Sequence, residues 1–187
     1  MEQRLIIAAC ETLGPEIAAA VASSGAPSVD HLPLRCRCGV GSLRWEHLPK
    51  AGDIPDGAQL HVFGAGCLSQ LLADAPAHPN VHLHQLGACQ ELFVSPSQVD
   101  ALVHRGAYLV TGGWLRSWEH RLAELGAVDE ESRKMFSETC SSVVLLDSSV
   151  TEPDRERLAA FAAAVSLPFE VVTVGNEVME RLSLIHI

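Results

Sequence analysis

The hydrophobic positions of this chain fall into short runs that alternate with segments of helical pattern. Most runs are apolar at consecutive positions, as in "RLIIAA" near the start and "SSVVLLD" further on. A strand buried on both faces has this pattern, because helices cover both sides of a parallel sheet. The expected strands are residues 4–9, 28–34, 59–65, 81–87, 107–112, 141–147 and 169–174.

The segments between these runs carry the start and stop signals of helices. Gly14-Pro15 places a proline in a first helical turn, Ser42 stands where an N-cap is needed, and Gly106 closes a helix that opens at "SPSQ". The expected helices are residues 15–24, 42–48, 67–75, 88–94, 95–106, 113–126, 129–140, 152–166 and 175–182. This alternation predicts an α/β fold, a Rossmann-like parallel sheet with helices on both faces.

The last residues of the chain have a sequence that does not look native. "LSLIHI" resembles the translated sequencing-adapter tail of many metagenomic reading frames, so residues 183–187 are expected to be an artefact of truncation. A short native apolar end is the alternative. We expect a single domain over residues 1–182, with a division into two lobes near residue 106 left open.

Charge and composition narrow the classes of partner. The chain has 187 residues, 48% of them hydrophobic, and a net charge of −10. It has no basic cluster longer than "RCRC", which argues against nucleic acid and against an anionic membrane surface as partners. No apolar run approaches the roughly 18 residues of a membrane span. A cytoplasmic protein is therefore expected, and its six cysteines should be reduced thiols or metal ligands.

Cysteines follow the first four expected strands. Cys10 ends "LIIAAC", Cys67 ends "VFGAGC" and Cys89 ends "LGAC", while Cys38 lies in the loop after the second strand. Because the carboxyl ends of parallel strands meet at one edge of a sheet, we expect these four thiols to lie close together. Cys36 could take the place of Cys38, since "RCRC" offers both.

A shared thiol site has a definite chemistry. Helix N-termini, and the cations Arg35 and Arg37, should lower the pKa of nearby thiols. Thiolates bind zinc and iron–sulfur clusters, so either is the expected cofactor, and Gly64 and Gly66 would let the backbone approach it closely. The alternative is that each cysteine fills core space, which we expect of Cys140.

Other residues suggest a ligand pocket or simple packing. Tyr108 and Trp114 flank a strand end and could wall a small-molecule pocket beside the cysteines, although Trp114 and Trp118 at helical spacing favour packing on the sheet. His82 and His84 share one strand face and are expected to be half-exposed. Asp147 is expected to cap the turn after its strand.

Two nucleotide motifs are incomplete here. "GAGCLS" lacks the third glycine of a dinucleotide site, and "CGVGSL" lacks the lysine of a phosphate loop.

Several segments resemble an uncharacterised family, catalogued as domain of unknown function 1638. They are "IIAACETLGPEI", "LPLRCRCGVGSLRWEHL", "VFGAGC", "LGAC", "AYLVTGGWLRSW", "VVLLDSSV" and "AAFAAAVSLPFEVV". The chain is most similar to the version found at the N-terminus of longer bacterial sensor or signalling proteins. That resemblance implies a C-terminal signalling domain as partner.

The chain also departs from the family pattern. Many free-standing members have His-Asp-Cys where this chain has Gly87-Ala88-Cys89, and a glycine, Gly112, stands where a proline is usual. Many also carry a histidine near the position of Cys38. Free-standing relatives often accompany corrinoid methyl-transfer systems, which implies a link to methyl or metal metabolism.

The sequence thus leaves three hypotheses. The first is a sensory or accessory domain that binds a metal or iron–sulfur cluster through Cys10, Cys38, Cys67 and Cys89. The second is an enzyme that uses Cys67, Cys89 or an open metal site on a small substrate or a corrinoid. The third is an interaction domain whose cysteines only pack.

Overall fold

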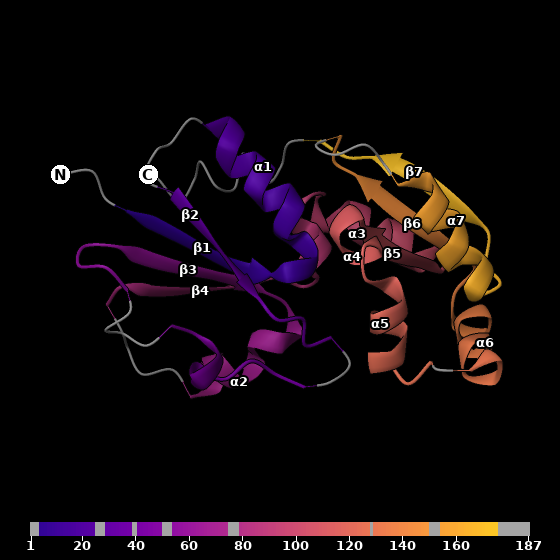
Figure 1. The fold of residues 1–187 in the computed structure, drawn as a ribbon, viewed down its shortest axis with the longest axis horizontal. Coiled ribbons are helices and arrows are strands. Elements are labelled where there is room, and N and C mark those ends of the chain that lie inside the picture. The colour runs from indigo at the N-terminus through magenta and orange to yellow at the C-terminus, as the bar shows by residue number, and fades with distance from the viewer. Residues whose placement is uncertain are drawn as a thin grey trace. The chain divides into compact units, whose positions relative to one another are not determined.

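The computed structural model describes residues 4–24, 29–38, 41–49, 54–74, 79–127, 129–149 and 154–175 (Figure 1). All seven expected strands are present in these ranges. The strands are β1 Leu5–Cys10, β2 Val29–Leu34, β3 Gln59–Gly64, β4 Val81–Gln85, β5 Ala107–Thr111, β6 Ser142–Asp147 and β7 Phe169–Thr173. The α-helices are α1 Gly14–Ser24, α2 Ser69–Ala73, α3 Pro96–His104, α4 Gly112–Leu115, α5 Trp118–Glu124, α6 Glu130–Thr139 and α7 Arg155–Ala164. The 3₁₀ turns are η1 Glu11–Leu13, η2 Trp45–His47, η4 Gly66–Leu68 and η5 Cys89–Leu92.

The strands form two parallel sheets rather than the one that the sequence predicts. One sheet has the order β2-β1-β3-β4 and the other the order β5-β6-β7. They belong to two compact units, unit 1 (Met1–Cys89) and unit 2 (Gln90–Ile187). A hydrophobic pattern predicts a strand but not the strand with which it pairs. The number of sheets could therefore not be predicted from the pattern. The α/β class with parallel sheets and flanking helices is confirmed.

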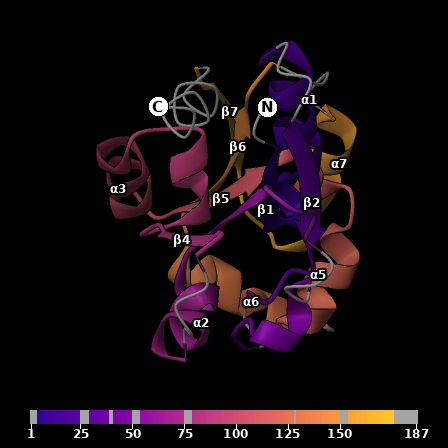
Figure 2. The same ribbon diagram turned by 90° about the vertical axis from the view of Figure 1, so that its left-hand side faces the viewer.

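Unit 1 has helices on both faces of its sheet. Ile6 and Ala8 of β1 point to the same face as Leu60 and Val62 of β3, because β1 and β3 pair in register. This face carries a core that includes Leu68 of η4 and Leu71 of α2. In both views α1 lies on one side of the sheet and α2 on the other (Figures 1 and 2).

Unit 2 has its core between the sheet and α7. Val143 and Leu145 of β6 pack with Leu158 and Phe161 of α7, and all four side chains are at most 1% exposed. Tyr108, Trp114, Trp118 and Phe136 surround Phe161. The predicted packing role of Trp114 and Trp118 is confirmed.

The helices differ from prediction in several places. Residues 88–94 contain the 3₁₀ turn η5 rather than an α-helix, and the expected helix 67–75 begins as the 3₁₀ turn η4 before α2. Residues 42–48 contain only the 3₁₀ turn η2, whose N-cap is Arg44 rather than Ser42. The expected helix 113–126 is broken into α4 and α5, with Arg116 and Ser117 between them. The predicted helix 175–182 and the tail 183–187 lie outside the described residues, apart from Gly175.

Two predicted caps are confirmed. Ser95 caps α3 by accepting a hydrogen bond from the Gln98 N–H, and Asp147 caps its turn by accepting one from Ser149. No helix in the described ranges is both long and apolar enough to cross a membrane.

Candidate thiol site

The thiols of unit 1 lie together where its strands end. Cys36 is at the centre of this group: its thiol is hydrogen-bonded to the thiols of both Cys10 and Cys38. Cys36 also interacts electrostatically with Cys67, and Cys38 interacts with Cys67 and Cys89. We call these five residues the thiol group: Cys10, Cys36, Cys38, Cys67 and Cys89.

The register of the sheet explains why Cys10 meets Cys36. β1 and β2 pair in parallel, with Cys10 level with Leu34 at the last position of both strands. Two residues beyond Leu34, the Cys36 N–H donates to Glu11 Oε1 over 3.0 Å. This hydrogen bond ties the loop after β2 to the turn after β1, and Cys36 is only 2% exposed.

Cys67 is positioned by the sharp turn after β3. Its carbonyl oxygen accepts a hydrogen bond of 2.7 Å from the Leu43 N–H. A Cβ on Gly64 would lie 2.9 Å from Leu68 Cγ and 3.0 Å from Cys67 Sγ. Gly64 therefore permits the close approach of Cys67 to the strand end. Gly66 has open space around its Cβ position, so no such need applies there.

The thiols are not activated in the way that the sequence predicts. Hydrogen bonding to Cys36, followed by burial, raises the pKa of both Cys10 and Cys38, and burial raises the pKa of Cys67. The expectation of lowered thiol pKa values is wrong for these three residues. Strands β1, β3 and β4 are followed by short 3₁₀ turns rather than by long helices, and the thiols of Cys10 and Cys38 have Cys36 as a hydrogen-bond partner.

One cation of the "RCRC" loop, Arg37, has a partner outside the thiol group. Its Nη2 lies 2.8 Å from His47 Nε2. Because His47 Nδ1 in turn accepts from the Arg44 N–H, Arg37 and His47 connect the loop to η2. The two residues thus hold the loop that carries Cys36 and Cys38.

The donor set of the thiol group suits a soft metal, since thiolates are the preferred ligands of zinc and iron–sulfur clusters. The sulfur atoms are not already arranged around a point. In the part of the chain that the structure describes, no three or more His, Cys, Asp or Glu side chains are placed so that they could hold a metal ion. Binding a metal would therefore require the thiols to move closer together.

The aromatic residues predicted to wall a ligand pocket are packed in unit 2. The rings of Tyr108 and Trp114 meet edge to face with centroids 5.8 Å apart, and both pack on the core around Phe161. This packing accounts for both side chains without a ligand. Cys140 also belongs to unit 2, where it is the C-cap of α6.

A stack of histidines that the sequence did not reveal lies on the β3 and β4 strands of unit 1. His61 stacks on His82 with ring centroids 4.6 Å apart, and its Nδ1 lies 2.9 Å from His84 Nε2. The register pairs His61 with His82. The spacing of His82 and His84 was visible in the sequence, but only strand pairing brings His61 beside them. His82 and His84 are half-buried, as predicted.

We expect the free energy of unfolding to fall as the pH is lowered from about 6.5 to about 5.5. Burial lowers the pKa of His31 and His84 below 6.5, and the charge of His82 lowers that of His84 further. The unfolded chain therefore binds protons in this range that the folded chain does not. Each histidine contributes a slope of at most about 1.4 kcal/mol per pH unit. Urea unfolding at a series of pH values measures how the free energy of unfolding depends on pH.

The matched variants for this prediction are His84→Gln and His104→Gln, the latter on the exposed surface of α3. His84→Gln should flatten the pH dependence, and His104→Gln should leave it unchanged. Equal slopes for wild type and the double variant His31→Gln/His84→Gln would contradict the prediction.

Comparison with known proteins gives a family and no activity. A family model described as "Protein of unknown function (DUF1638)" matches residues 55–183. No curated protein and no solved structure matches the chain.

Proposed function

Since the chain belongs to the DUF1638 family, whose description gives no activity, the function has to come from the site, and we propose that unit 1 is a metal-binding domain. Its thiol group would hold an iron–sulfur cluster or a zinc ion. The observation that carries this proposal is the convergence of thiols on Cys36, from separate loops of one sheet edge.

The ligand chemistry supports a closed site. Zinc in structural sites and iron–sulfur clusters both take four cysteine ligands, and the thiol group offers five. The sequence selected Cys10, Cys38, Cys67 and Cys89. Cys36 and Cys38 each interact with three other thiols of the group, and Cys36 is hydrogen-bonded to two of its three partners. Cys36 is therefore a ligand in our proposal, and one of the others is spare.

The role of such a domain would be sensory or accessory. Closure of separate loops around a metal would make their arrangement depend on metal or redox state. A C-terminal signalling domain in a longer protein would read that change. Reduced thiols in this number suit the cytoplasm, which is the proposed location.

An enzyme with a cysteine nucleophile has weaker support. A thiol nucleophile needs a lowered pKa, and burial raises that of Cys67. The prediction of a corrinoid or small-substrate enzyme stays open for a metal site with a free position. Rapid alkylation of one thiol by iodoacetamide in metal-free protein would favour the nucleophile.

The proposal is tested by anaerobic purification followed by an absorption spectrum and elemental analysis. Wild type should carry about one zinc ion or one cluster per chain, the latter with a broad thiolate-to-iron band. Cys67→Ser should lose the metal, and Cys140→Ser, whose thiol lies in unit 2, should keep it. A folded wild type that stays metal-free after reconstitution with zinc or with iron and sulfide would overturn the proposal.

A further inference from the structure

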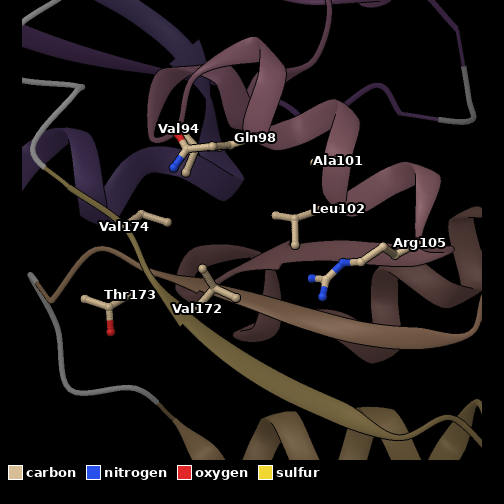
Figure 3. Close-up of a pocket in the computed structure, with 8 residues that line it drawn as sticks. All are labelled: Val94, Gln98, Ala101, Leu102, Arg105, Val172, Thr173 and Val174. Carbon is tan, nitrogen blue, oxygen red and sulfur yellow. The ribbon is translucent and has the colours of Figure 1, made fainter.

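Unit 2 contains a cavity that has no part in the thiol site. The cavity has a volume of about 260 Å³ and lies between α3 and β7 (Figure 3). Its apolar walls are Val94, Ala101, Leu102, Val172 and Val174, and its polar groups are Gln98, Arg105 and Thr173.

The fold explains why this space is apolar. Val171 of β7 packs on the core that includes α7. Glu170 and Val172 are its neighbours on either side in the strand, and Val174 follows two residues after Val172. Side chains at alternate positions of a strand point to opposite faces, so Val172 and Val174 face away from that core. They meet Leu102 of α3 across the cavity instead.

A guanidinium group lies at one end of the cavity. Figure 3 shows the Arg105 side chain extending from the end of α3 toward Leu102 and Val172. Its Nη2 donates to Glu170 Oε1 over 3.0 Å, an ion pair in which both side chains are about half exposed. An exposed pair of this kind is worth little, so Glu170 is easily exchanged for another carboxylate. A guanidinium also has further donors in the same plane.

From this arrangement we propose that the cavity between α3 and β7 binds a small aliphatic monocarboxylate. The carboxylate would pair with Arg105, and the hydrocarbon chain would lie between Leu102, Val172 and Val174. The volume is below the roughly 300–1,000 Å³ of pockets for drug-sized ligands, which favours a short chain. A cationic ligand would be repelled by Arg105, and a strongly polar ligand would place polar groups against the apolar walls.

The proposal is tested by ligand-observed NMR titration of the full chain with hexanoate, 1-hexanol and hexylamine. Hexanoate should bind most tightly and hexylamine least. Arg105→Gln should weaken hexanoate at least about threefold while leaving hexanol unchanged, because an exposed charge pair contributes modestly. Lys134→Gln, which removes an exposed charge on α6, is the control for net charge.

A second pair of variants tests the place of binding. Ala101→Trp would fill the cavity from an exposed position of α3, and Val103→Trp would add the same bulk at an exposed position outside the lining. Hexanoate binding should be lost in the first and kept in the second. Equal affinity for hexanoate and hexylamine, no binding of any probe at millimolar concentration, or binding that survives Ala101→Trp would each overturn the proposal.

Discussion

Cys36→Ser is expected to lower the metal affinity of the protein by more than about a hundredfold. Cys36 is hydrogen-bonded to Cys10 and Cys38 and interacts with Cys67, so its removal takes away the thiol that connects Cys10 to the rest of the group. Loss of a supporting group around a metal already costs about 10- to 100-fold, and a direct ligand is worth more. Competition against a zinc chelator measures the affinity.

Cys38→Ser provides the comparison within the same loop. Cys38 has the more solvent-exposed side chain of the two, although the atoms around its thiol still desolvate it. Serine at position 38 should therefore be tolerated better by the fold and should cost less affinity if Cys38 is the spare thiol. Far-UV circular dichroism shows whether each variant is folded. A folded Cys36→Ser variant with wild-type metal affinity would exclude Cys36 as a ligand, and Cys10→Ser would then show whether the rest of the group binds metal.

Phe161→Ala should destabilise unit 2 by about 3–5 kcal/mol, the usual range for deleting a fully buried aromatic side chain. Phe161 is 0% exposed, and its ring lies 4.9 Å from that of Trp114 and 5.8 Å from that of Trp118. The substitution would leave a cavity beneath all the rings that surround it. Urea unfolding followed by the fluorescence of Trp114 and Trp118 measures the free energy of unfolding.

Phe169→Ala is the matched control for that variant. Phe169 is on β7 of the same unit but is 43% exposed, so its removal should cost under about 1.5 kcal/mol. If the two variants unfolded at the same urea concentration, Phe161 would not be the centre of the core. Metal content should remain that of wild type in Phe169→Ala, since the thiol group lies in unit 1.

The strands and the residues that form them could be predicted from the sequence. Apolar runs such as "SSVVLLD" have too few polar positions to lie on a surface, and hydrophobic burial then fixes them as interior strands. The strand-end positions of Cys10, Cys67 and Cys89 follow from the same pattern. The aromatic packing of Trp114 and Trp118 was predictable because a helical spacing places both on one face.

The sequence could not decide which strands pair, or which side chains from different strands become neighbours. It favoured Cys38, with Cys36 as the alternative. The level ends of β1 and β2, with the Glu11 hydrogen bond, bring Cys36 beside Cys10. It showed His82 and His84, and only the pairing of β3 with β4 adds His61. It gave helix signals for residues 42–48, which tertiary contacts reduce to one 3₁₀ turn.

By itself, then, the sequence determined local structure and the positions of the thiols along the chain, because side-chain periodicity is a property of neighbouring residues. Only the tertiary structure decided that there are two sheets, that Cys36 connects the thiols, that their pKa values are raised, and that Arg105 faces an apolar cavity. The physical reason is the same in each case. Each of these features depends on which segments meet in space: the burial of a side chain, a hydrogen bond between distant residues and the lining of a cavity. The hydrophobic pattern of one segment does not identify the segments that will pack against it.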